Sequence, residues 1–413
     1  MGFLLPRLTP ADPGPAIAGL RPLDDPEICL LLHCGRADVS TEGAAQVRAL
    51  VDAGLDWDRV LALAARHGLR ALLHRHLTRL APAGVPDAPL AALRDYARKN
   101  SAFGVLFTGE LLRLLAALDA DGIDAVPFKG PALAQALYGH LALRQFCDLD
   151  ILVREGDVWR ASAILEAHGF VADAAVPDGK RAAFTRQDYV RLFRRDGGRT
   201  IIELHWAVSP RSFAVRFDGD AVWTRLTPMV LQGRTVRVPA SEDLLLMLCV
   251  HGSRHGWDKL ENLASVAELV RSSPSLDWAA LWHRADAMHC RRMVAFGLLL
   301  AHALFDAPLR PEAAAAWHSS PLRAMARQIV RDSGAADAPA PGVASRTARY
   351  LRLKDTYTDR ARAVAREFTT STPDDWALVD LPGPLSVAYP LVRVLRVARK
   401  HGFTPHPAAG GGQ

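Results

Sequence analysis

The sequence predicts an α+β protein, in which a small β-sheet flanked by helices lies between helical segments at both ends of the chain. Three observations indicate this class. Apolar residues recur at helical spacing through the first hundred residues, β-prone runs and turn signals take over between about residues 125 and 238, and helical spacing returns from Ser241. The sheet should therefore lie in the middle of the chain.

The composition is that of a folded globular protein. Of the 413 residues, 50% are hydrophobic and 23% are charged, which excludes the signature of a disordered chain. The apolar run LLLMLCV at 244–250 is too short to span a bilayer, and the N-terminal residues lack the apolar core of a secretory signal. The five scattered cysteines are typical of reduced thiols, so we expect a cytoplasmic protein without a membrane span.

The net charge of +6 is spread along the chain and is not gathered into blocks. Diffuse positive charge is compatible with an anionic substrate and is weak evidence for nucleic acid. We therefore predict no specific nucleic-acid partner.

The first predicted unit is a helical subdomain over residues 1–100. In WDRVLALAARHGLRALL, for example, Val60, Leu63 and Ala64 fall on one stripe. A further helix is expected from about Ala102 to Leu118, ending near Gly122, which suits a helix C-terminus.

The second predicted unit is an α/β core over residues 101–240. DAVPF should form a short strand, KG a turn, and PALAQALYG a helix with Pro131 at its first position. A loop through Arg144 then leads to CDLDILV, whose alternation places Leu149, Ile151 and Val153 on one face.

Two further signals complete this core. GDVWRASAILEAHGF should be a helix that ends at Gly169, and YVRLFRRDGGRTIIELHW should be a hairpin with Ile201, Glu203 and His205 on one face of its second arm. A second hairpin is expected around Gln232 and Gly233.

The remainder of the chain should be mainly helical. With Ser241 as a candidate N-cap, residues 241–333 should form a helical subdomain. Gly, Pro and Ala dominate residues 334–345, which should be a linker; residues 346–405 should be a C-terminal helical segment and residues 406–413 a disordered tail.

Asp148 and Asp150 project from the same side of the predicted strand. Burying two ionised carboxylates so close together is unfavourable, because desolvation and mutual repulsion both oppose it. A divalent metal such as Mg²⁺ would resolve this conflict, with Glu203 on a neighbouring strand as a third oxygen ligand. The alternative is that the aspartates lie at a solvated edge of the sheet.

The turn that precedes this strand carries a second signal. A helix begun at Pro131 directs its backbone N–H groups and positive end toward the KG turn, where phosphate oxygens could be received. Lys129 adds a positive charge; the alternative is an exposed turn lysine.

The order strand, KG, helix, Arg144, CDLDILV, helix, hairpin and IIELHW resembles the nucleotidyltransferase superfamily that includes DNA polymerase beta. Within it, the chain is most similar to uncharacterised bacterial nucleotidyltransferases that have Lys-Gly where the wider superfamily has Gly-Ser. The similarity extends to HGSRHGWDKLENLASVAELV, to DWDRVLALAARHGLRALL and to TPDDWALVDLPGPLSVAYPLVRVLRVARK, and so covers nearly the whole chain.

The resemblance implies a polymerase-beta-like core with a small mixed β-sheet, and roles for its matching residues. Asp148 and Asp150 would hold two Mg²⁺ ions, or Mn²⁺, and Glu203 would be a third ligand or help to deprotonate the acceptor. Lys129 and Gly130 would contact phosphates.

Arg144 would be a second anion contact in the same implied site. The implied reaction transfers a nucleoside monophosphate from an NTP, with ATP the first candidate, to a small-molecule, peptide or protein acceptor. Ser265 departs from the family pattern, because an acidic residue is expected there.

Several histidines and cysteines allow both a functional and a structural interpretation. His251 and His255 share a helical face and would ligate a metal, contact the nucleotide or acceptor, or pack between helices. His205 would touch substrate or be structural. CLLLHC, with its two cysteines and a histidine, would be a zinc knuckle or a core helix.

The C-terminal RVLRVARKHG is basic and amphipathic, and would meet a membrane or an acidic partner, or pack on its own protein. Two alternatives to an enzyme follow from the sequence: a non-catalytic nucleotide-binding or antitoxin-like interaction protein that retains the fold, and a helical adaptor.

Overall fold

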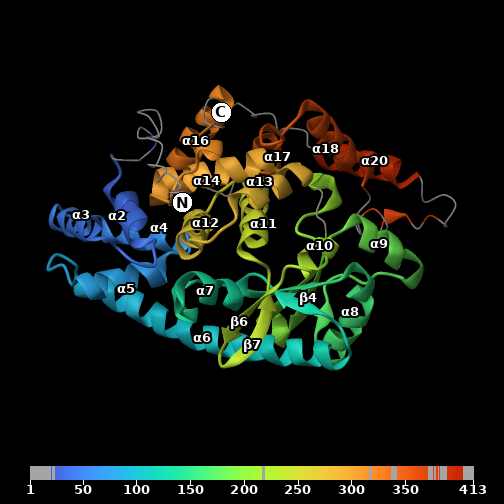
Figure 1. The fold of residues 1–413 in the computed structure, drawn as a ribbon, viewed down its shortest axis with the longest axis horizontal. Helices are drawn as coiled ribbons and strands as arrows, with labels where there is room; N and C mark the ends of the chain where they lie inside the picture. Colours follow the sequence, from blue (N-terminus) through green and yellow to red (C-terminus); the bar gives the residue numbers. More distant parts are fainter. Residues whose placement is uncertain are drawn as a thin grey trace, which may run out of the picture.

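The computed structural model describes residues 20, 24–215, 219–315, 319–335, 342–370, 375, 378–379, 381 and 388–402. Of the segments predicted as a linker and a disordered tail, residues 336–341 and 406–413 lie outside the described residues. Figure 1 shows a sheet-containing layer below a group of helices from the second half of the chain, with the N-terminal helices at one side.

The N-terminal part of the chain is helical. Its helices are α2 (Pro26–Cys34), α3 (Thr41–Asp52), α4 (Trp57–Arg66), α5 (Arg70–Leu80) and α6 (Asp87–Ala120). Asp25, Ser40 and Asp56 each accept a hydrogen bond from a backbone N–H in the first turn of the following helix. The CLLLHC segment is the second half of the apolar helix α2, and Cys34 is buried in the main hydrophobic core.

The helix predicted to begin at Ala102 begins earlier, at Asp87, and continues to Ala120. It therefore runs across the boundary predicted at residue 100. Gly122 follows it in the left-handed region, with φ +69°, as predicted. By length and composition alone α6 would suffice to cross a membrane; one side of it packs on α5, α8 and β1.

The sheet has five strands in the order β1-β2-β5-β4-β3. The strands are β1 (Ala125–Pro127), β2 (Asp148–Val153), β3 (Val171–Ala172), β4 (Val190–Arg195) and β5 (Thr200–His205). β2 and β5 are parallel and the other neighbours are antiparallel, so the sheet is mixed. The predicted α+β class, with a small mixed sheet, is confirmed.

The two faces of β2 differ, as the alternation in its sequence predicts. Leu149, Ile151 and Val153 are buried in a core that also contains apolar residues of α6 and α8 (Val158–Ala167). Leu152 points to the other face, into a smaller cluster with Val126 of β1. Asp150 shares this second face, which the helices α7 (Gly130–Tyr138) and α11 (Ser241–Arg254) border.

Both predicted hairpins are present. β4 and β5 form the first, and β6 (Thr227–Leu231) with β7 (Arg234–Val238) forms a separate two-stranded sheet. The shorter elements are α9 (Arg181–Gln187), α10 (Gly219–Trp223) and the 3₁₀ turns η1 (Leu141–Leu143), η2 (Glu155–Asp157), η3 (Asp178–Lys180), η4 (Asp196–Gly198) and η5 (Arg211–Phe213).

Helices follow from Ser241 to the end of the described residues. After α11 they are α12 (Leu260–Ser272), α13 (Trp278–Ala287), α14 (Arg291–Phe305), α15 (Pro311–Ala315), α16 (Ser320–Ser333), α17 (Val343–Arg352), α18 (Tyr357–Thr369) and α20 (Tyr389–Gly402). The N-cap prediction at Ser241 is wrong, because Ala240 occupies that position and the Ser241 hydroxyl accepts a hydrogen bond from Ser273.

Candidate active site

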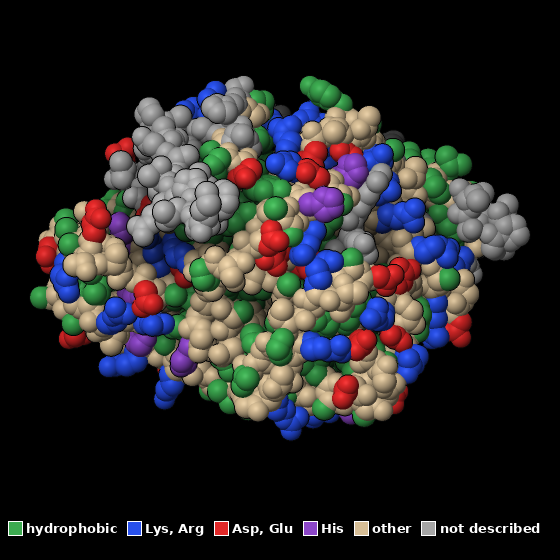
Figure 2. Space-filling model, in the orientation of Figure 1, with side chains coloured by type: hydrophobic (Ala, Val, Ile, Leu, Met, Phe, Trp, Pro, Cys, Tyr) green, Lys and Arg blue, Asp and Glu red, His purple; other side chains and the backbone are tan. Residues whose placement is uncertain are grey.

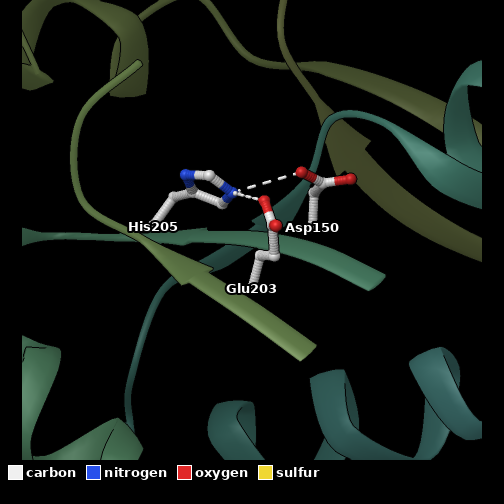
Figure 3. A group of neighbouring side chains, drawn as sticks. All are labelled: Asp150, Glu203 and His205. Carbon is white, nitrogen blue, oxygen red and sulfur yellow. Dashed lines mark hydrogen bonds and ion pairs between the residues drawn. The ribbon is translucent and has the colours of Figure 1, made fainter. Parts of the chain in front are cut away.

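The parallel pairing of β2 with β5 brings acidic residues together that lie far apart in the sequence. In this register the Cα atom of Asp150 is paired with that of Glu203, and Leu152 is paired with His205. Because alternate residues of a strand share a face, Glu203 and His205 project on the same side. Figure 3 shows the three polar side chains converging above the sheet.

The imidazole of His205 lies between the two carboxylates. Its Nε2 atom is 3.1 Å from Oδ1 of Asp150 and 3.0 Å from Oε2 of Glu203. A carboxylate oxygen only accepts, so Nε2 carries the hydrogen and is shared between both acceptors. The three side chains place possible ligand atoms within 4.8 Å of one another. The two carboxylates suit a metal ion as they stand, whereas Nε2 of His205 would first have to lose its hydrogen.

A lysine also contacts this group. The Nζ atom of Lys129 donates a hydrogen bond of 2.6 Å to Oδ1 of Asp150. Burial alone raises the pKa of Asp150, but the Lys129 ammonium and the His205 ring outweigh it and hold this pKa below its ordinary value. Asp150 is therefore an ionised carboxylate inside the protein, and the cation beside it is an ammonium.

Asp148 begins β2 and lines the same cavity as Asp150 and Glu203. Burial and the charges of these two neighbours raise the pKa of Asp148 to about 6, against the opposing effect of Lys129 and Arg144. The site thus gathers more negative charge than Lys129 offsets, a situation that a divalent cation would relieve.

The cavity has a volume of about 270 Å³ and carries charges of both signs. Its cationic side chains come from separate elements: Lys129, Arg144, Arg254 and Lys259. Its acidic side chains are Asp148, Asp150, Glu203, Asp258 and Glu261. Among the described residues, the buried Nε atom of Arg144 has no hydrogen-bond partner, and the charge of this guanidinium also acts on the Glu261 carboxylate.

The N-terminus of α7 lies directly against β2. Gly130 has φ +53°, and a Cβ atom at this position would lie 3.2 Å from the carbonyl oxygen of Asp148. Glycine is therefore favoured both by the backbone conformation and by the close approach of the two elements. Lys129 is the N-cap residue and supplies no side-chain cap, so the first N–H groups of α7 have no partner from this side chain.

The chain also matches a protein family. The sequence model of a family described as "Uncharacterised nucleotidyltransferase" matches residues 53–306. This chain belongs to that family. The matched segment contains every residue that lines the cavity described above.

Comparison with solved structures gives remote likenesses. The chain is similar to the solution structure of the antibiotic-resistance factor ANT(2'')-Ia, with 16% identity and a TM-score of 0.30, over 44% of this chain and 91% of that chain. It is also similar to an antigenic nucleotidyltransferase-like protein from Paracoccidioides brasiliensis, with 16% identity and a TM-score of 0.26, over 54% of this chain and 97% of that chain. No curated protein matches the chain.

Most residues that the sequence singled out face one cavity of the protein. Asp148, Asp150, Glu203, Lys129, Arg144, His251 and His255 all line it. The ligand atoms that lie closest together belong to Asp150, Glu203 and His205, so the structure adds a histidine to the expected acidic set. His205 and Gly130 lie behind the lining, where His205 orients the carboxylates and Gly130 lets α7 approach β2.

His251 and His255 lie together at the end of α11, with ring centroids 4.5 Å apart. Burial and the nearby Lys129 charge lower the pKa of His251 well below its ordinary value. Burial and the Arg254 charge lower that of His255 to about 4. Both rings are therefore neutral near pH 7, and neither lies in the cluster of closely spaced ligand atoms.

Sequence reasoning missed several lining residues. Arg254 stands between the two histidines in HGSRHGW, and Asp258, Lys259 and Glu261 follow in the same motif, so their charge was a usable signal. Tyr189, which also lines the cavity, carried no such signal in the sequence. Ser265, which replaces an expected acidic residue, lies outside the cavity lining, and its Oγ atom donates to the carbonyl oxygen of Glu261 at 2.7 Å.

Proposed function

We propose that this protein is a metal-dependent nucleotidyltransferase that transfers a nucleoside monophosphate from an NTP, with ATP as the first candidate, to an acceptor and releases pyrophosphate. Family membership supports the reaction class. The observation that carries the proposal is the buried Asp150, held in register with Glu203 at a cavity that also presents four cationic side chains.

The donor set fits divalent metal ions. Asp148, Asp150 and Glu203 supply hard oxygen ligands, the type that Mg²⁺ and Mn²⁺ prefer. When bound, two such ions would neutralise charge on the triphosphate and on the leaving pyrophosphate. Oδ1 of Asp150 already accepts from both Lys129 and His205, so a metal ion would be held by the second carboxylate oxygen or would compete with Lys129 for the first.

The chain's own cations would bind the triphosphate. Lys129 lies at the N-terminus of α7, where backbone N–H groups would also receive an anion. Arg144 and Lys259 line the same cavity from η1 and α12. These groups would orient the α-phosphate for in-line attack, which is the main contribution a protein makes to phosphoryl transfer.

Glu203 is suited to accept the proton of the acceptor. The His205 N–H binds its Oε2 atom, which leaves Oε1 without this hydrogen bond in a residue that lines the cavity. Burial opposes ionisation, but the hydrogen bond from His205 lowers the pKa of Glu203 overall. The carboxylate is therefore ionised at neutral pH and can take up the proton from an acceptor hydroxyl in the cavity.

The test begins with the nucleotide alone. ATP should raise the melting temperature in Mg²⁺ and lose this effect in EDTA, and a panel of the four NTPs ranks the bases. Asp150→Asn should abolish the Mg²⁺-dependent shift. The control is Asp173→Asn, which removes a carboxylate from an ion pair with Arg194 and lies at the far edge of the sheet, on the residue after β3.

Transfer is then followed with ATP labelled at the α-phosphate or the γ-phosphate. Label from the α-position should appear on an acceptor, whereas label from the γ-position alone would mean a kinase-like reaction. Mg²⁺-dependent binding without transfer to any acceptor would favour a non-catalytic nucleotide-binding protein. An Asp150→Asn variant that responds to ATP like the unmodified chain would contradict the proposed site.

A further inference from the structure

A second cavity, of about 380 Å³, adjoins the candidate active site. Arg254 and His255 line both cavities, so the two share a wall. The rest of the second cavity comes from η5 and from two C-terminal helices, with lining residues that include Phe213, Arg346, Tyr350, Leu351 and Val364. We call it the α17–α18 cavity.

The helices that build this cavity lie outside the segment that the family model matches. That segment ends at residue 306, whereas α17 begins at Val343 and α18 at Tyr357. α17 packs on α11 and α18 packs on η5; Figure 1 shows both helices, in orange and red, above α11. The cavity thus joins family-matched residues to a part of the chain that the match does not cover.

One wall of the cavity is apolar and rigid. The rings of Phe213 and Tyr350 stack with centroids 4.0 Å apart and 19° between their planes. The Tyr350 hydroxyl donates to the Phe213 carbonyl oxygen at 2.6 Å, which fixes the ring. Leu351 and Val364 continue this surface. Such a wall suits an aromatic or aliphatic group of a ligand.

The shared wall carries positive charge. Among the described residues, neither Arg254 nor Arg346 forms an ion pair with a carboxylate, and Arg254 stacks on the ring of Tyr189 at 4.8 Å. Glu367, the acidic residue of the lining, is already paired with Arg393 at 2.8 Å. Asp188 and Asp258 lie near enough to Arg254 and Arg346 to interact with their charges, but neither forms a direct pair with them. The cavity therefore offers two guanidinium groups without a directly bonded carboxylate next to an apolar wall, which favours a ligand with a negative charge.

We propose that the α17–α18 cavity binds the acceptor, and that this acceptor combines an aromatic or aliphatic body and an anionic group with the hydroxyl that is modified. The inference rests on the proposed function, since it assigns the second substrate of that reaction. The acceptor oxygen forms a bond to the α-phosphorus, the bond from this phosphorus to the bridging oxygen breaks, and pyrophosphate leaves. The hydroxyl proton passes to Glu203.

Three phenols of similar shape but different charge test this selectivity: 3-(4-hydroxyphenyl)propionate is anionic, 4-propylphenol is neutral and tyramine is cationic. Their affinities are measured by ligand-observed NMR titration with the full chain, Mg²⁺ and a non-hydrolysable ATP analogue. The anionic phenol should bind about tenfold more tightly than tyramine, as expected for one charge-assisted contact. Arg346→Gln should remove most of that difference.

A variant that fills the α17–α18 cavity, together with a matched control, tests whether the phenol binds there. Val364→Trp should weaken binding of the anionic phenol at least about tenfold, because the indole occupies the cavity. Val394→Trp on α20 makes the same change at nearly the same exposure, 43% against 42% for Val364, outside the cavity lining, and should change nothing.

The ATP response separates this inference from the proposed function. Val364→Trp should retain the full Mg²⁺-dependent thermal shift with ATP. Equal affinities for the three phenols, unchanged phenol binding in Val364→Trp, or a loss of the ATP shift in that variant would overturn the assignment to the acceptor while the unmodified protein still responds to ATP. No ATP response in the unmodified protein would overturn the proposed function, and the acceptor site with it.

Discussion

The Lys129 ammonium lies 2.6 Å from Oδ1 of Asp150, in a salt bridge whose side chains are 14% and 2% exposed. The pair joins the N-terminus of α7 to the middle of β2. Asp150 is paired with Glu203 across the sheet, so the same lysine offsets the most buried charge of the candidate site. Figure 2 shows other Lys and Arg side chains spread among acidic ones over one face of the protein, in contact with solvent.

Removal of this lysine should destabilise the protein strongly. Lys129→Met leaves the Asp150 carboxylate buried without its ammonium partner, and the free energy of unfolding should fall by about 3 kcal/mol in urea denaturation at pH 7.5. Lys99→Met is the matched control. Its ammonium is also 2.6 Å from a carboxylate, that of Asp95, but the two side chains are 72% and 46% exposed.

The free energy of unfolding of the Lys99→Met control should fall by less than about 1 kcal/mol. Lys129→Met combined with Asp150→Asn should be more stable than the sum of the single changes implies, because the double variant leaves no buried charge unpaired. Equal losses for the Lys129 and Lys99 variants would contradict the assigned burial.

Alanine substitutions at Gly130 and Gly139 should distinguish the stability cost of backbone strain from the cost of close packing. Both glycines have positive φ, +53° and +62°, at opposite ends of α7. Gly139→Ala meets nothing within 4 Å and should cost about 1 kcal/mol of left-handed strain. Gly130→Ala adds a contact of 3.2 Å with the Asp148 carbonyl, so it should cost more and weaken the Mg²⁺-dependent ATP shift.

Urea denaturation and the thermal shift measure these two effects. An ATP response that is unchanged in Gly130→Ala would show that the approach of α7 to β2 does not shape the nucleotide site.

His67 should make stability depend on pH. Its Nδ1 atom accepts the Leu260 backbone N–H at 3.2 Å, so Nε2 carries the hydrogen and donates to the Ser333 carbonyl at 2.8 Å. The ring is fully buried, and burial lowers its pKa from 6.5 to about 4. The folded protein therefore holds a neutral ring where the unfolded chain takes up a proton.

The neutral His67 ring makes its full contribution to the free energy of unfolding above pH 6.5. This contribution is lost as the pH falls toward 4, and the loss reaches up to about 3 kcal/mol. Other buried histidines act in the same direction, so the informative quantity is the difference between the unmodified chain and His67→Gln. This difference in unfolding free energy, measured by urea denaturation between pH 7.5 and 4.5, should shrink as the pH falls; a constant difference would refute the assignment.

Ser265 should be dispensable for nucleotide binding. Its hydroxyl donates to the Glu261 carbonyl one turn earlier in the same helix, and it does not line the candidate-site cavity. Ser265→Ala should cost less than about 1 kcal/mol of stability and leave the ATP shift unchanged. Ser265→Asp, which would bury a carboxylate, should cost at least about 2 kcal/mol. Loss of the ATP shift in the alanine variant would assign Ser265 a role in the site.

Local sequence patterns were enough to predict much of the fold. The alternation in DLDILV placed Leu149 and Ile151 in one core and Asp150 on the opposite face, since side chains of a strand alternate whatever surrounds them. The DGG turn signal located the hairpin of β4 and β5 for a similar reason. The boundary of α6 was misplaced because Asn100 lies inside the helix and bonds to the Ala142 carbonyl, a contact remote in sequence.

The sequence by itself determined the alternation of strands and helices and the acidic and basic residue types of the candidate site, because these depend on spacing along the chain. Only the tertiary structure decided which charges meet. The parallel register of β2 with β5 sets Glu203 beside Asp150, and the packing of α11 brings Arg254 to both cavities. Such neighbours are tens of residues apart, and the packing of apolar faces far from them fixes their separation.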